Sequence, residues 1–443
     1  KIGYTRYNNH NYINLIVEKY NMGYGIPGSV EGHINGVDID IVKNTFQINF
    51  HSDISFNNFK QFDMNYSLID YEHKEFENTL EYSTVALARN THNIKLKLES
   101  PNTVIGSEYT YKQFSPSGYY WTPSTSEIDF SLYGFNEKEL KYFNFSSSFR
   151  VGYLLISPNR DNISFSNLDS QEVKNRDFKY FSSSFGFKKY IDKFKFSSWL
   201  ISTMKAPKIE DLYSDGPHLG SYSYEIGDPN LKLEEIYGIE SSASYSTQKL
   251  HLSLTTFYNY SPYYHQMTKM GECGEEYVSD SHPCAGADFI EWGSGPGWLH
   301  KYQIEGVESL IKGLELNIDY TYQKLKISYD FSLVRGDDLT NVIPLSYINP
   351  DKQILIFKYQ EKLMSYMFRL SYIDSQNRLG EFETYTPSSF LVDFILSYNH
   401  KNQNFTIQCN NIFNIEYYNH LSKIKSIMPE FGRNLIISYK ILL

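Results

Sequence analysis

The chain has no apolar run near the roughly eighteen residues at which a segment is read as a membrane-spanning helix. It has no excess of basic residues either, because its formal net charge is −10. Nucleic-acid binding requires a basic face that neutralises phosphates, so nucleic acid is not an expected partner. The motifs G-x-S-x-G and H-E-x-x-H are missing, as is a phosphate-cradling glycine loop. We therefore assign no catalytic residue and do not expect an enzyme.

Cysteine is scarce, with only three residues in the chain. Cys273 and Cys284 share one long polar loop, residues 261–299, and we predict a disulfide between them because surface loops meet an oxidising compartment. A thiolate metal pair is the alternative, and the lack of C-x-x-C spacing argues against it. His265 in the same loop could recruit cations, although a charged surface loop is the simpler interpretation. Cys409 is expected to be a small buried apolar residue.

Aromatic residues are abundant: 40 Tyr, 30 Phe and 4 Trp make up 17% of the chain. Many alternate with polar residues, as in FNFSSSFRVGY, and a period of two predicts strands with one apolar and one polar face. This pattern fits a transmembrane β-barrel, although a large soluble β protein fits the composition about as well. In the barrel, the residues predicted to face lipid include Phe143, Phe145, Phe149, Leu325, Ile327 and Tyr329, and those predicted to face the lumen include Ser146, Ser148, Lys326 and Asp330.

Strand-like segments recur from Tyr12 to Leu442, and we count eighteen of them. Every second connection is long and the others are short turns, which is typical of a barrel with periplasmic turns and extracellular loops. We therefore predict an all-β fold, a transmembrane antiparallel β-barrel formed by residues 1–443 in the outer membrane of a Gram-negative bacterium. No initiator Met or signal peptide is present, so we expect that earlier residues are missing.

The segment from Lys205 to Glu235, KAPKIEDLYSDGPHLGSYSYEIGDPNLKLEE, is too long to be a hairpin turn. Loops of this length without regular periodicity are usually functional. This one gathers Asp215, His218 and Glu225 with glycine and proline. We predict that it forms part of a ligand site.

The same segment resembles the signature region of TonB-dependent outer-membrane receptors. NNIFNIEYYN and PEFGRNLIISY resemble the C-terminal end of that family, and IKGLEL resembles a glycine-containing strand upstream of it. YGIPGSVEGHINGVDIDI, DYEHKEFEN and the GPH-x-x-x-x-x-YEIG spacing lean toward the zinc-uptake members. The resemblance implies a 22-stranded barrel with an N-terminal plug, so the plug, the TonB-contacting segment and four strands would be absent from this chain. The chain departs from the family by ending in KILL, where an aromatic residue is usual.

By this resemblance, the metal ligands would be His218 of the GPH motif and a carboxylate of the DYEHKEFEN loop, Glu75 or Glu77. His73 lies close by in sequence, and His33 is the one histidine in a loop where zinc-type relatives often carry several. Zinc takes imidazole nitrogen and carboxylate oxygen, and the remaining ligands would come from the absent plug. The alternatives are a hydrogen-bonded His218 within a rigid loop and a solvated acidic loop for the others.

Aromatic loop residues give a different signal. Tyr120 and Trp121 could stack on a siderophore or porphyrin, and we include them with Asp215 and Glu225 in the predicted ligand site. Their alternative role is in the interfacial aromatic belt of a barrel.

The resulting hypothesis is active uptake of a scarce metal ion or metal chelate. Zinc or an iron chelate would be the transported ligand, and no tightly bound cofactor is expected. The expected partners are the TonB complex, contacted through the missing N-terminal segment, and the lipid and lipopolysaccharide of the outer membrane. A haem or siderophore receptor of the same fold is the main alternative. A passive porin or a surface adhesin is a further alternative.

Overall fold

The computed structural model describes residues 1–28, 36–77, 82–118, 120, 122–160, 171–218, 223–269, 289–291, 298–381, 383–422, 425 and 428–441. Long strands form the wall of a barrel. In chain order they are β1 Ile2–Asn8, β2 Asn11–Ile26, β3 Val37–Phe56, β4 Phe59–Glu77, β5 Val85–Glu99, β6 Thr103–Gly118, β7 Thr125–Glu139, β8 Asn144–Pro158, β9 Arg176–Ile191, β10 Phe194–Lys205, β13 Glu234–Ser246, β14 Leu250–Lys269, β16 Trp298–Tyr322, β17 Leu325–Asp338, β19 Lys352–Gln360, β20 Met364–Ile373, β21 Ser389–His400, β22 Gln403–Asn410 and β23 Asn434–Ile441.

Four short strands and one short helix lie in the long connections. They are α1 Ile209–Tyr213, β11 Asp215–His218, β12 Ser223–Ile226, β15 Phe289–Glu291 and β18 Ile343–Pro344. Within the described residues, no helix has the length and apolar character needed to cross a membrane.

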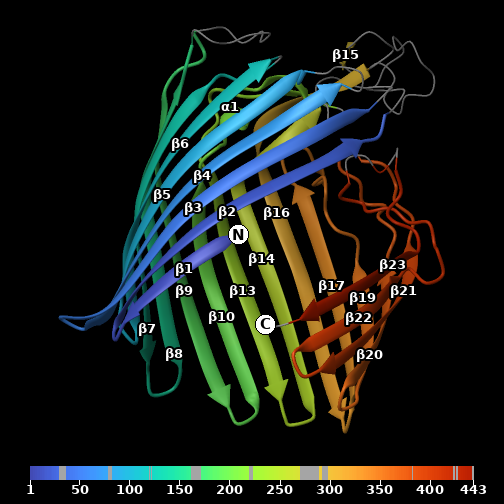
Figure 1. Cartoon of the computed structure of the whole chain (residues 1–443). Helices are drawn as coiled ribbons and strands as arrows, with labels where there is room; N and C mark the ends of the chain where they lie inside the picture. The colour runs from blue at the N-terminus through green and yellow to red at the C-terminus, as the bar shows by residue number, and fades with distance from the viewer. Residues whose placement is uncertain are drawn as a thin grey trace.

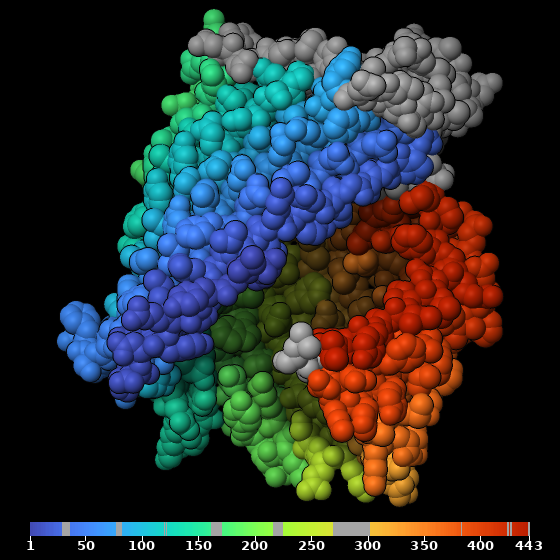
Figure 2. All heavy atoms as spheres, in the orientation of Figure 1, coloured from blue at the N-terminus to red at the C-terminus, as the bar shows by residue number. Residues whose placement is uncertain are grey.

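All the strands belong to one sheet. Each wall strand pairs antiparallel with its neighbours, from β1 at one end to β23 at the other. In the described part of the chain, no backbone pairing joins β1 to β23. Figures 1 and 2 show the wall curving around a lumen, with β1 and β23 on either side of an opening in front. The predicted all-β antiparallel barrel is therefore confirmed.

The predicted count of eighteen strands is one wall strand short. Every predicted strand is present, but β1 was missed because its seven residues, IGYTRYN, are followed by a turn of only two residues before β2. The register joins Asn8 to Asn11, so β1 and β2 form a tight hairpin. Many strands are also longer than predicted, and β16 reaches 25 residues.

The alternation of β8 gives the two faces of the wall. Phe149, Val151 and Tyr153 are 40–47% exposed on the outer face. Ser146 and Ile156 on the inner face are no more than 2% exposed. In β8, period-two alternation therefore places the aromatic residues outward, as the sequence indicates, whereas the inner face carries serines toward the turn and Leu154 and Ile156 toward α1.

Several glycines of the wall lie beneath an aromatic ring of the neighbouring strand. Gly186 is the register partner of Trp199, and a Cβ added to Gly186 would meet the Trp199 ring at 2.5 Å. Gly152 lies beneath Tyr180 in the same way. Gly313, the glycine of IKGLEL, lies beneath Phe257. A ring that covers a strand glycine supports the pairing register.

We expect Gly186→Ala to lower the free energy of unfolding by about 1–3 kcal/mol, because the added methyl group forces Trp199 out of its position. The measurement is the urea midpoint of the folded barrel in detergent. Gly3→Ala is the control, since a Cβ at Gly3 would meet its nearest atom at 3.7 Å. Equal midpoints for both variants would contradict the assigned role of the ring.

Candidate functional site

The segment between β10 and β13 begins with α1, which is anchored inside the mouth of the barrel. The Lys208 backbone N–H donates to Asp211 Oδ2 at 2.9 Å and closes the first turn. Ile209, Leu212 and Tyr213 are at most 1% exposed and pack against inward-facing residues of the wall. These wall residues are Phe114 of β6, Leu154 and Ile156 of β8, and Phe178 of β9. The apolar face of the helix therefore fixes this end of the segment.

The second half of the segment reaches a different part of the wall. β11 and β12 form a hairpin, and β12 runs parallel to the first residues of β16. Burial raises the pKa of Tyr347, in the connection after β18, to about 12, and the negative charges of Glu383 and Glu225 add to the rise. Glu225 of β12 is therefore near enough for its charge to act on the Tyr347 hydroxyl. The segment spans from the β5–β9 side of the mouth to the β16–β19 side, and Figure 1 shows α1 within the upper end of the barrel.

Tyr71, His73 and Glu75 follow one another at intervals of two residues along β4, so their side chains lie on the same face of the strand. Arg89 of β5 lies directly opposite Tyr71, and its Nη2 is 3.1 Å from Glu210 Oε1 of α1. This ion pair identifies the shared face as the one that meets the segment in the mouth.

His73 and Glu75 form a close pair on that face. His73 Nε2 is 3.2 Å from Glu75 Oε1, and Glu75 is only 6% exposed. Among the described residues, Glu75 Oε2 is buried and makes no hydrogen bond. Imidazole nitrogen and carboxylate oxygen are donors that zinc and other transition metals accept. The pair could supply two protein ligands to a metal.

The structure places only part of the predicted metal set. His218 is the last residue of β11 and Glu77 the last of β4, and only the backbone is described at both positions. His33 lies outside the described residues, as do Trp121, Cys273 and Cys284, so the disulfide stays a prediction. No group of three or more His, Cys, Asp or Glu side chains among the described residues is arranged to hold a metal ion.

Three residues of the predicted ligand site have described side chains, and each is buried or half-buried. Asp215 at the base of the β11–β12 hairpin is 4% exposed and Tyr120 is 8% exposed. Glu225 of β12 is half-buried. The prediction that His265 lies in a loop is wrong, because the residue belongs to β14. Its Nε2 is 2.9 Å from the Lys232 carbonyl oxygen. β14 continues to Lys269 through a register shift that a strict period of two does not reveal.

A buried polar cluster joins three of the connections on the same side of the barrel, and the sequence analysis missed it. His420 Nε2 is 2.9 Å from Glu383 Oε1, and the two side chains are 0% and 3% exposed. His420 Nδ1 is 2.9 Å from the Thr386 hydroxyl and 3.2 Å from Lys425 Nζ. The backbone N–H groups of Tyr347 and Gly380 donate to the Glu383 carboxylate. Lys425 donates to Nδ1, which fits the tautomer with its proton on Nε2.

These contacts shift the charge equilibria of the cluster. Burial alone would raise the pKa of Glu383, but the bonds from His420 and from the Gly380 and Tyr347 backbones outweigh it and lower the pKa. Burial lowers the pKa of Lys425. No short-range pattern could have found this cluster, because its members come from positions 347 to 425 and meet only in the folded loops.

The described structure is thus an antiparallel barrel whose mouth holds an anchored segment, with the His73–Glu75 pair on the inner face of β4. The sequence profile of the family "TonB dependent receptor-like, beta-barrel" matches residues 1–415. The chain belongs to this family of transport receptors.

Solved structures of transporters share the fold. The copper transporter OprC superposes with a TM-score of 0.81 at 12% identity, over 98% of this chain and 72% of that one. The FrpB iron transporter from Neisseria meningitidis has a TM-score of 0.73 at 11% identity, over 99% and 70%. The hemophore receptor HasR of Serratia marcescens has a TM-score of 0.67 at 11% identity, over 99% and 70%. No curated protein sequence matches the chain.

Proposed function

We propose that the chain is the barrel of an outer-membrane receptor that captures a scarce metal ion or metal chelate at its mouth and imports it with energy from TonB. The observation that carries the proposal is the His73–Glu75 pair, which faces a segment anchored across the mouth. Two donors are too few for a metal site, so further ligands would come from the substrate's chelator or from other segments. His218, Asp215 and Glu225 are the proposed contributors from the crossing segment.

The identity of the metal rests on the donors. The similar structures include a copper transporter, an iron transporter, a hemophore receptor with haem and a ferric enterobactin receptor, so they do not point to one metal. The zinc preference is therefore supported by the sequence motifs and by the imidazole–carboxylate pair alone. A chelate receptor is favoured by a different observation: the half-exposed Arg89 guanidinium beside Tyr71 could contact an anionic chelate.

The test is a titration of the purified receptor with zinc chloride, haem and ferric enterobactin, by calorimetry. We expect His73→Ala and His218→Ala to weaken metal binding by more than about tenfold, because each would remove a direct ligand. Binding should also weaken as the solution is acidified, because a protonated imidazole cannot coordinate a metal. His51→Ala is the control, since His51 lies toward the turn end of β3 and pairs with Asp63 at 2.7 Å.

The outcomes separate the alternatives. Loss of zinc binding alone would select the free ion, and loss of haem or enterobactin binding without zinc binding would select a chelate. Unchanged affinity for all three ligands in both variants would remove His73 and His218 from the site.

A further inference from the structure

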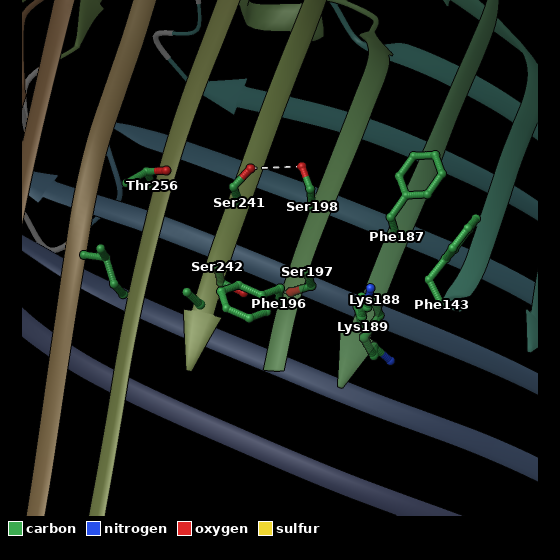
Figure 3. A pocket seen from close by; sticks show the side chains of 12 residues that line it. Phe143, Phe187, Lys188, Lys189, Phe196, Ser197, Ser198, Ser241, Ser242 and Thr256 are labelled. Carbon is green, nitrogen blue, oxygen red and sulfur yellow. Dashed lines mark hydrogen bonds between the residues drawn. The ribbon is translucent and has the colours of Figure 1, made fainter. Parts of the chain in front are cut away.

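A trough crosses the outer face of β10, β13 and β14 near their turn ends. Figure 3 shows it from outside, with the blue strands of the opposite wall behind. Phe178 of β9 packs on α1 inside the barrel. Alternation therefore places Phe187 and Lys189 of β9 on the outer face. The trough has a volume of about 540 Å³.

The trough arises from one row of small side chains between rows of large ones. Across the strands, the floor row pairs Ser198 with Ser241 and Ser241 with Thr256. The row above it is large, and the row below it contains two large apolar residues. The residues above are Phe185, Leu200, Ile239 and Tyr258, and those below are Phe196, Ala243 and Leu254. The missing side-chain volume of the floor row leaves a channel that runs across the strands.

The floor is polar in composition but paired internally. Ser198 Oγ and Ser241 Oγ are 2.9 Å apart, and Figure 3 shows the two hydroxyls pointing toward one another. A hydrogen bond within the floor satisfies these groups without water. The surrounding surface is apolar, with Phe143 and Phe187 rings 5.7 Å apart at one end. The volume is in the range of pockets that bind small ligands.

The trough opens toward a basic side chain at the level of the aromatic belt. Phe194 and Tyr245, with ring centroids 4.8 Å apart, lie below it at the turn end of the wall. Aromatic residues gather where a barrel crosses the membrane–water interface. Lys189 is in the same outer row as Phe196, whereas Lys188 faces inward, 3.8 Å from Glu137. Lys189 therefore lies where the phosphates of the turn-side leaflet would be.

We propose that this trough binds one acyl chain of an anionic glycerophospholipid from the turn-side leaflet, with its phosphate held by Lys189. The inference rests on the membrane placement of the proposed receptor and not on its metal ligand. The small floor gives room for the chain, the large rows hold it on two sides, and the lysine provides a positive charge for the headgroup.

The experiment is native mass spectrometry of the purified receptor exchanged into phosphatidylglycerol or phosphatidylcholine with matched acyl chains. We expect wild type to retain phosphatidylglycerol about fivefold better, the factor that corresponds to roughly 1 kcal/mol from one basic residue near an anionic surface. Lys189→Ala should remove this preference. Ser198→Ala with Ser241→Leu should lower retention of both lipids, because it fills the floor without leaving an unpaired hydroxyl.

Two controls separate volume from chemistry. Ser198→Ala with Ser241→Ala keeps the trough open and should retain lipid as wild type does. Ser147→Leu adds the same bulk to β8, outside the trough, and should also retain it. Wild-type retention by the filled variant, or an unchanged lipid preference in Lys189→Ala, would overturn the proposal. Metal and chelate titrations should be unaffected in every variant, so failure here is distinct from failure of the proposed function.

Discussion

Glu383→Ala is expected to open the buried cluster that joins three connections of the barrel, at a cost of about 3–5 kcal/mol in local stability. The carboxylate accepts bonds from the backbones of Tyr347 and Gly380 and lies 2.9 Å from His420 Nε2. Its removal leaves the buried His420 imidazole and the buried Gly380 N–H without the carboxylate that they contact. Amide hydrogen exchange of peptides spanning residues 345–351 and 378–388 should accelerate by about a hundredfold to several thousandfold.

Two variants serve as controls for this effect. Glu383→Gln keeps an oxygen acceptor and similar volume, so exchange should increase less. Glu361→Ala removes an exposed partner of Lys324, 2.9 Å away, and should leave the loops unchanged. If Glu383→Ala exchanges at the wild-type rate in both peptides, Glu383 does not hold the loops together.

The same carboxylate predicts a pH dependence. The pKa of Glu383 in the folded loops is below its ordinary value of 4.5. A lowered folded pKa means that the stabilisation is present above about pH 4.5 and is lost as pH falls through the folded pKa. Exchange corrected for its intrinsic pH dependence should therefore rise below pH 4.5 in wild type and change less in Glu383→Gln.

The strands of the wall could be predicted because apolar and polar residues alternate along them. Each wall strand other than β1 has enough residues to show a period of two, because one face is apolar and the other lines a polar lumen. Strand ends could not be predicted from alternation. β14 extends beyond Tyr260 through the shift between Ser261 and Tyr264, and such an irregularity breaks the period.

The candidate site could be predicted only where its residues are close in sequence. His73 and Glu75 are two residues apart on one strand, so alternation places them on one face. Arg89 and Glu210 meet through an ion pair that joins β5 to α1, and nothing in either local sequence indicates it. The crossing of the mouth likewise depends on the burial of Leu212 and Tyr213 against distant strands.

The crossing segment is held at two places, α1 and β12. Its first part is fixed by apolar burial, and its hairpin is fixed by pairing with β16. In the proposed receptor, groups on the anchored elements, such as Glu225 of β12, would lose less conformational freedom on ligand binding than the same groups on a free loop, because folding has already ordered these elements.

Phe149→Arg is expected to destabilise the barrel folded in lipid by about 2–4 kcal/mol, because Phe149 is 47% exposed on the outer face near the middle of β8. A charge at that position would lie in hydrocarbon. The same substitution at Ser148 points inward, beside the Ser184 hydroxyl at 2.7 Å, where the lumen is polar. Ser148→Arg should therefore cost less than Phe149→Arg.

The measurement is reversible folding into lipid vesicles across a denaturant series. A cost for Ser148→Arg equal to or larger than that for Phe149→Arg would reverse the assignment of the two faces, and with it the placement of Phe187 and Lys189 toward lipid.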